Sequence, residues 1–474
     1  MMGNVRADAE AIWSAAIRSA QPVRLMTDGR LICDPQQPWT FAGAAIEPAV
    51  HLDAIDRIVV VGAGKAAAGM AAGVEQLLAT TDRSRHRLAG VVSVPAGTDA
   101  PLQHVSLCPT RPVGENLPTL ESVAVTGEIL LLMASLGPSD LAIAVITGGA
   151  SALLVAPRVG VTLAEKISLT QFLLAAGADI AELNTVRRAT SLVKAGGLAR
   201  ACTAGRLVVF ILSDVIGDRL DVIASGPCMP IVAQPEEALA ILKKYGAIEA
   251  GVVPQLERLL LADRDTQVAQ PHSFISNWTT PRGCNVSHTI VGNNQTAVAS
   301  AAAVAQRRGY QTEGRTTAPV DCFSPPESAE AAGHRLAGEA AALLAAARTD
   351  GRPRALIEGG EPTVRVPFDH GRGGRNQQLV LAAIHSIQRA GMPWPEGLLI
   401  ASIGTDGEDG PTDAAGAHAG SSVFAAIAQQ ALDVPTALAR CDAYPLFAAA
   451  GGLIRTGPTG TNVADVRIIL ARPT

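Results

Sequence analysis

The chain has few aromatic residues, no excess of basic charge and no long apolar run. Aromatic side chains make up 3% of its 474 residues, and its formal net charge is -5. We therefore expect neither the basic surface nor the stacking platforms of a nucleic-acid-binding protein. No apolar stretch reaches the roughly 20 residues of a membrane-spanning helix, and the first residues lack a signal-peptide pattern. Neither nucleic acid nor a membrane is an expected partner.

Cysteine is scarce as well. The seven cysteines are scattered along the chain, and none forms a close pair with another. This spacing fits neither a zinc site nor a disulfide scaffold. We therefore expect a reduced chain with a cytoplasmic location.

Short β-branched runs alternate with helical patterns over most of the chain, which predicts parallel sheets covered by helices. A first series of strands is predicted at 57–61, 90–94, 141–146 and 206–212, and a second at 289–291, 355–357, 398–403 and 466–470. The stretch 271–285 has no period. We therefore predict two α/β domains, at 1–275 and 286–474.

The apolar run 206–212 ends abruptly in polar residues. Ser213 and Asp214 follow it directly, and Gly217 and Asp218 come next. Ligands of open α/β sheets gather outside the carboxyl ends of the strands, so these carboxylates suggest a metal or phosphate site. The alternative is a helix-capping aspartate in an ordinary polar turn.

A glycine-rich turn with a lysine follows the strand at 57–61. Gly62, Gly64 and Ala67 match the dinucleotide-binding pattern G-x-G-x-x-A, which is a weak signal alone. The next strand lacks the terminal acid that would hold a ribose hydroxyl. Lys65 in the turn suits a phosphate or a carboxylate instead, whereas the alternative is an exposed lysine on a first helical turn.

Hydroxyls and glycines follow the strand at 141–146. Gly148, Gly149 and Ser151 would let the backbone approach an anion closely, although a tight strand-to-helix turn explains them equally well. The basic segment 184–194, which ends at Lys194, is as compatible with a solvated helix face as with a substrate role.

A third loop combines glycines, a guanidinium and a helix start. Gly374, Arg375 and Asn376 open a helix that runs to about residue 390, and such a terminus favours anions. The alternative is a flexible surface loop. Glu361 and Asp406 add carboxylates at two more strand ends.

Cationic anchors, glycine-rich strand ends and acids for a divalent cation are the parts that phosphoryl transfer requires. The chain has neither a Walker A sequence nor the protein-kinase motifs. Residue chemistry alone therefore predicts a protein that binds a phosphate-bearing ligand together with a metal.

Several of these blocks resemble the MOFRL-type glycerate 2-kinases, a family also labelled hydroxypyruvate reductase. The resemblance spans nearly the whole chain and is most specific in Ser213–Asp218 and Gly373–Gln377. It implies ATP-dependent phosphorylation of D-glycerate to 2-phospho-D-glycerate with Mg²⁺. It also implies a Rossmann-like three-layer N-terminal domain, a smaller C-terminal α/β domain and an active site in the interdomain cleft.

Carried over by block, the resemblance makes Lys65, Asp214 and Arg375 the central active-site residues, with Glu361 and Asp406 nearby. Some positions depart from the family pattern: Arg111 stands where a histidine is usual, Gln378 replaces an acid, and Arg219 and Cys228 replace proline and threonine. Because Arg111 adds a positive charge where the family has an imidazole, the resemblance does not fix the exact substrate.

Our hypothesis is a Mg-ATP-dependent kinase that acts on a small hydroxy acid, D-glycerate first. Either Arg375 or Lys65 holds the acid's carboxylate, and the other steadies the transferring phosphate. Asp214 and Asp218 hold the metal, or one of them orients the attacking hydroxyl. The alternatives are an NAD(P)H-dependent hydroxypyruvate reductase and a ligand-sensing protein without turnover; a homodimer is left open.

Overall fold

The computed structural model describes residues 4–34, 37–79, 87–98, 100–112, 117–232, 234–266, 277–316, 327–391 and 393–473. The chain folds into two compact units. The N-terminal unit comprises Pro22–Ser213 and Asp218–Val291, and the C-terminal unit comprises Met1–Gln21, Asp214–Gly217 and Gly292–Thr474.

The N-terminal unit is built on a seven-stranded sheet with the order β6-β5-β4-β7-β8-β10-β9. The five strands β4 to β8 run parallel to one another. Every residue of β7 is buried, as expected for a strand with both faces covered. The sheet confirms the predicted α/β class. Its strands are β4 (Arg57–Ala63), β5 (Arg87–Pro95), β6 (Val105–Arg111), β7 (Leu141–Thr147), β8 (Arg206–Leu212), β9 (Asn277–Thr279) and β10 (Asn285–Gly292).

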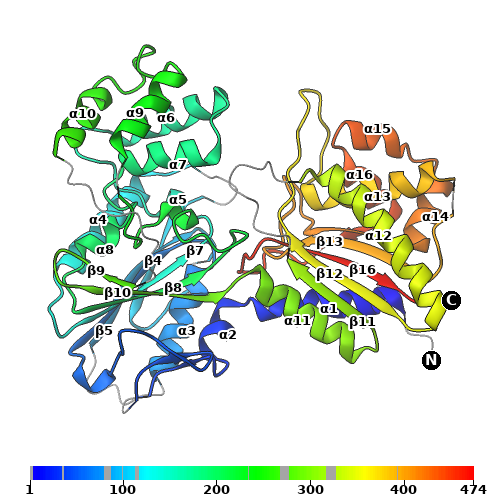
Figure 1. Cartoon of the computed structure of the whole chain (residues 1–474), viewed down its shortest axis with the longest axis horizontal. Helices are drawn as coiled ribbons and strands as arrows, with labels where there is room; N and C mark the ends of the chain where they lie inside the picture. The colour runs from blue at the N-terminus through cyan, green and yellow to red at the C-terminus, as the bar shows by residue number, and fades with distance from the viewer. Residues whose placement is uncertain are drawn as a thin grey trace. The chain divides into compact units, whose positions relative to one another are not determined.

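Helices pack on this sheet and also form a separate group. Helices α3 and α4 contact the strands directly, whereas α6, α7, α9 and α10 share a core of their own that includes Leu173 and Leu183. Figure 1 shows these four helices grouped together at the top of the N-terminal unit. The helices are α2 (Pro22–Thr27), α3 (Ala67–Ala79), α4 (Leu120–Ala134), α5 (Ala150–Leu153), α6 (Leu163–Ala175), α7 (Ile180–Ala189), α8 (Gly197–Ala201), α9 (Pro235–Lys244) and α10 (Leu256–Thr266).

Short elements complete the N-terminal unit. A small antiparallel sheet joins β1 (Leu31–Ile32), β2 (Thr40–Phe41) and β3 (Ala44–Ala45), and the 3₁₀ helices are η1 (Leu52–Ala54) and η3 (Ile223–Ser225). In the part of the chain that the structure describes, no helix is both long and apolar enough to cross a bilayer.

The C-terminal unit has a mixed six-stranded sheet with the order β11-β12-β16-β13-β14-β15. The last strand of the chain, β16, lies between β12 and β13 and runs antiparallel to both. β11 and β12 are parallel. The strands are β11 (Gln311–Thr316), β12 (Arg354–Gly360), β13 (Leu398–Gly404), β14 (Gly416–Ala419), β15 (Leu453–Ile454) and β16 (Asp465–Ala471).

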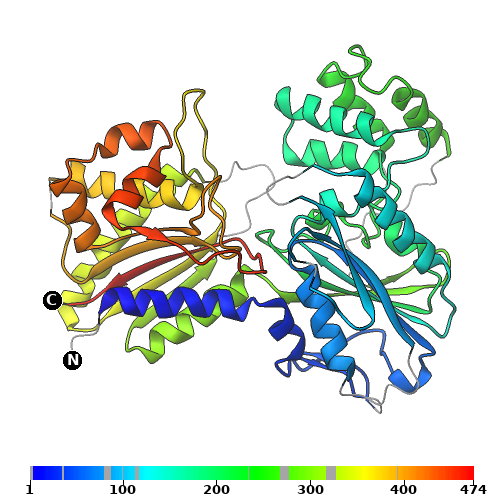
Figure 2. The same ribbon diagram turned by 180° about the vertical axis from the view of Figure 1, so that it is seen from behind.

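Helices cover both faces of this second sheet. Helices α12 and α13 pack against each other on one face, and α1 and α11 lie side by side on the other (Figures 1 and 2). The helices are α1 (Val5–Ser19), α11 (Asn294–Arg307), α12 (Ala329–Asp350), α13 (Arg375–Arg389), α14 (Ser421–Gln429), α15 (Val434–Ala439) and α16 (Ala443–Ala450).

Apart from the short segment Asp214–Gly217, the two units depart from the predicted ranges 1–275 and 286–474 at two places. Helix α1 belongs to the C-terminal unit, where Asp8 accepts hydrogen bonds from Arg308 (2.6 Å), Tyr310 (2.8 Å) and Arg472 (2.7 Å). Strand β10, expected to begin the second series of strands, pairs within the N-terminal sheet instead. Both departures depend on which partner a segment meets, and local sequence does not encode that choice.

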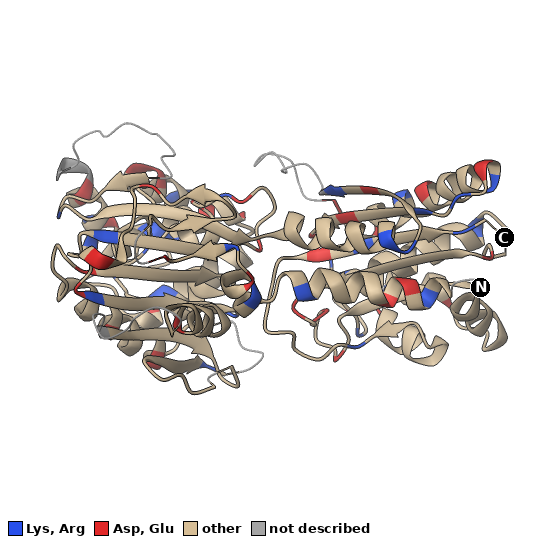
Figure 3. Cartoon of the chain, turned by 90° about the horizontal axis from the view of Figure 1, so that it is seen from below, with Lys and Arg blue, Asp and Glu red and all other residues tan. Residues whose placement is uncertain are grey.

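Charged residues of both signs are interspersed over the elements of each unit. Figure 3 shows no continuous stripe of Lys and Arg in its view, which agrees with the slightly negative net charge.

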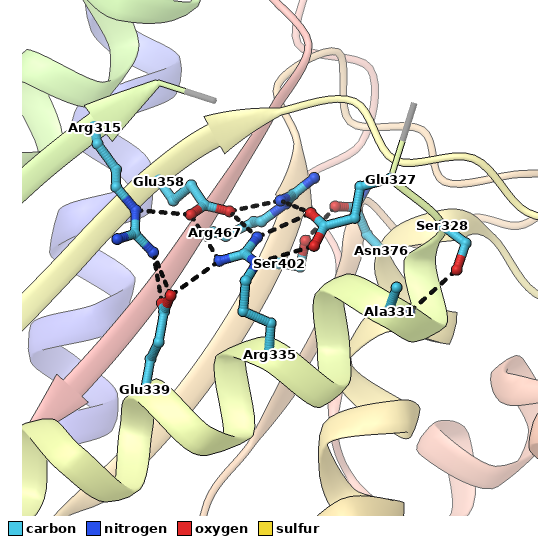
Figure 4. A network of polar contacts seen from close by, with 10 residues as sticks. All are labelled: Arg315, Glu327, Ser328, Ala331, Arg335, Glu339, Glu358, Asn376, Ser402 and Arg467. Carbon is cyan, nitrogen blue, oxygen red and sulfur yellow. Dashed lines mark hydrogen bonds and ion pairs between the residues drawn. The ribbon is translucent and has the colours of Figure 1, made fainter. Parts of the chain in front are cut away.

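Glu358 stands at the centre of a buried ion network on the α12 face of the C-terminal sheet (Figure 4). Its carboxylate accepts hydrogen bonds from Arg315 (2.9 Å), Arg335 (2.7 and 3.0 Å) and Arg467 (2.6 Å). Burial would raise the pKa of Glu358, but these arginines hold it below its ordinary value. The network ties β11, β12 and β16 to helix α12.

We expect Glu358→Gln to lower the free energy of unfolding by about 3–5 kcal/mol, because it removes the buried carboxylate that pairs with Arg467 and leaves that guanidinium only the partly exposed Glu327 at 3.5 Å. Urea unfolding measures the change. Glu313→Gln is the matched control: Glu313 is an exposed partner of Arg315 at 3.6 Å, and its loss should cost about 1 kcal/mol or less. Equal effects of the two substitutions would contradict the central role of Glu358.

Candidate active site

Lys65 lies in the turn between β4 and α3, against the turn that follows β7. The backbone N–H of Lys65 donates to the carbonyl of Gly148 (2.9 Å), and the N–H of Ala66 donates to Oγ1 of Thr147 (3.1 Å). The two strands are parallel neighbours, so their carboxyl ends meet at one edge of the sheet. The structure thus brings Lys65 together with the predicted residues Gly148 and Gly149.

The glycines of these turns allow close packing. Gly64 has a φ of 136°, and a Cβ at that position would overlap Oγ1 of Thr147. A Cβ at Gly62 would overlap the carbonyl of Val145 on the neighbouring strand, and one at Gly149 would lie 3.4 Å from Cγ of Lys65. Close packing against β7 therefore explains the glycine at 62, and close packing against Thr147 explains the glycine at 64, with or without a bound dinucleotide.

Ser151 extends this group to a buried lysine. Nζ of Lys194 lies 3.4 Å from Oγ of Ser151 and donates to the carbonyl of Ala224 (3.1 Å). Only 3% of Lys194 is exposed, so it does not lie on a solvated helix face. Burial lowers the pKa of Lys194 well below its ordinary value. The basic segment that the sequence left undecided thus contributes a residue next to the predicted turn.

A second group of predicted residues surrounds the start of β16 in the C-terminal unit. Asp465, the first residue of β16, is fully buried and is opposite Gly360 of β12 and Gly404 of β13. Because β16 runs antiparallel to both neighbours, it begins where they end. Glu361 and Asp406 follow those two ends and therefore flank Asp465.

Arg375 joins this carboxylate cluster from the first position of α13. Its Nε and Nη2 donate to the two oxygens of Asp465 (2.7 and 2.8 Å), and Nη2 lies 3.3 Å from Oε1 of Glu361. Such a bidentate pair fixes the plane of the guanidinium. Burial would lower the pKa of Arg375, but Asp465 and Glu361 hold it above its ordinary value. Arg375 therefore stays charged.

Glu361 has a strongly shifted pKa. Burial of its carboxylate raises the pKa to about 7; Arg375 opposes the shift, whereas Asp465, Asp214 and Asp406 add to it. Half of the side-chain surface is nevertheless exposed, so the carboxylate remains accessible to solvent. A carboxylate that titrates near neutral pH is suited to proton transfer.

Asp214 belongs to this cluster through Asn462. The side-chain amide of Asn462 donates to Oδ2 of Asp214 (3.3 Å) and accepts from the N–H of Ala464 (3.1 Å). Asp214 lies in the short segment that belongs to the C-terminal unit, whereas Asp218, which has a φ of 53°, belongs to the N-terminal unit with Lys65. One unit therefore contains Asp214, Glu361, Arg375 and Asp406.

The cluster fits a divalent cation by its charge. Four carboxylates, those of Asp214, Glu361, Asp406 and Asp465, act on one another around a single guanidinium. Within the described ranges, no three His, Cys, Asp or Glu side chains are grouped to hold a metal ion. Mg²⁺ commonly binds one or two carboxylates together with water and substrate phosphates, so an open set of this kind suits it.

The N-terminus of α13 already holds a carboxylate of the protein. Oδ1 of Asp409 accepts from the N–H of Asn376, and Oδ2 accepts from the N–H of Gln377, both at 2.9 Å. A Cβ at Gly374 would overlap Asp409. The donors that the sequence suggested for an external anion therefore hold the loop that contains Asp406. Burial raises the pKa of Asp409 to about 6.

Sequence reasoning missed Asp409 and Asp465. Asp409 lies in a loop with Asp406, Glu408 and Asp413, and nothing in the order of these acids singles it out. Asp465 directly precedes the apolar run 466–470, so a lone acid at the start of an apolar strand was the available signal.

We expect the carboxyl group of Glu361 to titrate near pH 7. Because its folded-state pKa lies above the unfolded value, its contribution to stability is complete below pH 4.5 and is lost as the pH rises through 7. Selective ¹³C labelling of glutamate would follow the titration, with Glu361→Gln assigning the signal by its disappearance. A midpoint at or below 4.5 would contradict the expected environment.

Two family models match the chain. The first, described as a domain of unknown function (DUF4147), covers residues 8–260, and the second, the MOFRL family, covers residues 354–465. Together they include every predicted site residue.

Curated relatives match over most of their length. A human glycerate kinase is 37% identical over 88% of this chain and 84% of its own, and a Thermotoga maritima D-glycerate 2-kinase is 34% identical over 90% and 94%. A putative hydroxypyruvate reductase of Agrobacterium vitis is 35% identical over 87% and 99%.

A solved structure agrees with the fold. The crystal structure of a glycerate kinase from Thermotoga maritima matches with a TM-score of 0.77 and 32% identity, over 98% of this chain and 99% of that one. Motifs, fold and identity over nearly full length lead to one conclusion: the chain belongs to the MOFRL-type glycerate kinase family.

Proposed function

We propose that this protein transfers the γ-phosphate of ATP to D-glycerate and forms 2-phospho-D-glycerate with the help of Mg²⁺. The observation that carries the proposal is the convergence of Glu361, Asp406 and Asp465 on Arg375 at the start of β16. The identity of 34–37% to glycerate kinases over most of the chain supports it.

In the N-terminal unit, we assign the phosphates to Lys65 and the turn at Gly148 and Gly149. A lysine beside glycine-rich backbone is a common phosphate-binding arrangement, because the glycines let a phosphate approach closely. The hydrogen bond between Lys65 and Gly148 fixes the two turns together before any ligand binds.

In the C-terminal unit, we assign the carboxylate of glycerate to Arg375. Asp465 occupies Nε and Nη2 of its guanidinium, while Nη1 has no acceptor among the described residues. That nitrogen can donate to a substrate oxyanion without releasing Asp465. Glu361, with its pKa near 7, is the carboxylate that we expect to accept the proton of the attacking hydroxyl.

Asp214 and Asp406 are the residues that would hold Mg²⁺. When bound, the ion would neutralise charge on the phosphates during transfer. We retain Asp218 as a second candidate ligand of Mg²⁺ because its side chain is a carboxylate. We also propose a cytoplasmic location, since the cysteines in the described residues (Cys33, Cys108, Cys202, Cys228, Cys284 and Cys441) are all free thiols.

A coupled assay for ADP release tests the proposal directly. We expect ADP release that requires D-glycerate, ATP and Mg²⁺, with ³¹P NMR of the product locating the phosphate on C2. Consumption of NADH or NADPH with hydroxypyruvate would favour the reductase alternative, which the name of the Agrobacterium vitis relative suggests. Ligand binding without ADP release would favour a sensor.

Substitution of the two cations tests the assigned roles. We expect Lys65→Ala and Arg375→Lys each to lower kcat/KM by about a thousandfold, because charge neutralisation carries most of phosphoryl transfer. Lysine at 375 keeps a charge beside buried Asp465 but loses the bidentate geometry.

Two exposed residues serve as matched controls. Lys243→Ala in the N-terminal unit and Arg455→Lys in the C-terminal unit change cations whose side chains are 54% and 50% exposed. Both variants should retain the kcat/KM of the unmodified protein. Near-native activity of Lys65→Ala or Arg375→Lys, in protein that melts at the normal temperature, would refute the corresponding assignment.

A further inference from the structure

Lys194 is a buried amine with no carboxylate partner among the described residues. It is 3% exposed, and its Nζ contacts two neutral oxygens, the carbonyl of Ala224 (3.1 Å) and Oγ of Ser151 (3.4 Å). No carboxylate among the described residues forms an ion pair with it. Burial of an unpaired charge is costly, so burial lowers the pKa of such an amine, and an anion bound beside it would favour the charged form again.

The surroundings of Lys194 make the imbalance larger. Lys166 of α6 and Arg187 and Arg188 of α7 all lie close enough to lower its pKa further. Arg188 is near one carboxylate, Asp221, at 3.9 Å, but Asp221 is already paired with Arg219 at 2.6 Å. Glu237 of α9 also acts on Arg188, so among the described residues this group contains five basic side chains and two acids.

Arg187 likewise forms no ion pair with another described residue. In the described part of the chain, no oxygen accepts a hydrogen bond from its guanidinium, although burial lowers its pKa. Lys166 differs, since its Nζ contacts Oγ1 of Thr190 (2.8 Å) and the carbonyls of Thr190 and Arg187 (both 3.3 Å). Lys166 has the contacts of a structural lysine, whereas Lys194 and Arg187 do not.

The backbone near Lys194 is held in an unusual conformation. Ala224 and Ser225 have φ values of 53° and 61°, in the left-handed region that residues other than glycine seldom adopt. Ser225 is fully buried and its Oγ donates to Oδ1 of Asn184 on α7. Strain of this kind persists where the surrounding structure imposes it, and it is frequent at functional sites.

The position of Lys194 connects these cations to the glycine-rich turns. Ser151, its neighbour, directly follows the turn at Gly148 and Gly149, which is bonded to Lys65. An oxyanion seated on that turn would lie close to Ser151 and therefore to Lys194.

We propose that Lys194, assisted by Arg187, binds an oxyanion of a substrate at the Gly148–Ser151 turn. The oxyanion is a phosphate of the nucleotide or the carboxylate of the hydroxy acid, which share this chemistry. The assignment rests on the proposed kinase function and adds two binding residues to it. It also gives the basic segment 184–194 a substrate-binding role, which the sequence alone left undecided.

Equilibrium binding to the full-length protein tests the inference. Isothermal titration calorimetry would measure the Kd of D-glycerate in one arm and of the non-hydrolysable ATP analogue AMP-PNP with Mg²⁺ in the other. We expect Lys194→Met and Arg187→Gln each to weaken one ligand by about 10- to 100-fold, the loss typical of a hydrogen bond between charged groups. The affected arm identifies the source of the oxyanion.

Two controls separate binding from folding. Lys243→Met removes an exposed lysine of the same unit and should leave both Kd values unchanged. The melting temperature of each variant shows whether it folds. If Lys194→Met does not fold, Arg187→Gln provides the test. Kd values within twofold of the unmodified protein for both ligands, in a folded variant, would overturn the inference.

The outcome is separable from that of the proposed function. If the protein releases no ADP with D-glycerate but Lys194→Met still weakens a ligand, the kinase assignment fails and the oxyanion site stands. If ADP is released and Lys194→Met binds both ligands normally, the oxyanion site fails and the kinase assignment stands.

Discussion

The pairing of Arg375 with buried Asp465 is the interaction on which the C-terminal cluster depends. Asp465 is fully buried, so its charge requires the guanidinium, and the bidentate contact fixes where Arg375 points. Glu361 and Asp406 are then held around Arg375 by the ends of β12 and β13. A structural ion pair thus sets the geometry and the charge of the neighbouring carboxylates, including the raised pKa of Glu361.

Much of the fold follows from local sequence. The apolar, β-branched runs predicted β4, β7, β8 and β13 with nearly correct bounds, because a strand covered on both faces must be apolar throughout. What local pattern does not determine is the partner of a segment. Strand β10 adds to the first sheet, and helix α1 packs with residues about 300 positions away through Asp8.

The site was predictable to a similar degree. Strand ends located Lys65, Gly148, Gly149, Glu361 and Asp406, since the carboxyl ends of strands are where α/β proteins place their chemistry. The helix start at Arg375 was found for its anion-binding character, but the anion at its backbone donors is Asp409 of the same chain. Such internal partners, like Asp465, become visible once register and packing are known, because their signal lies in contacts rather than in spacing.

The central place of β16 has a consequence for biosynthesis. The strand that joins β12 to β13 follows both of them in the sequence, and it also supplies Asp465. While the ribosome is still translating, β12 and β13 have emerged without the strand that separates them, and Arg375 has no aspartate. The C-terminal sheet can therefore close only after β16 has been synthesised, and until then the facing edges of β12 and β13 lack the strand that pairs with both.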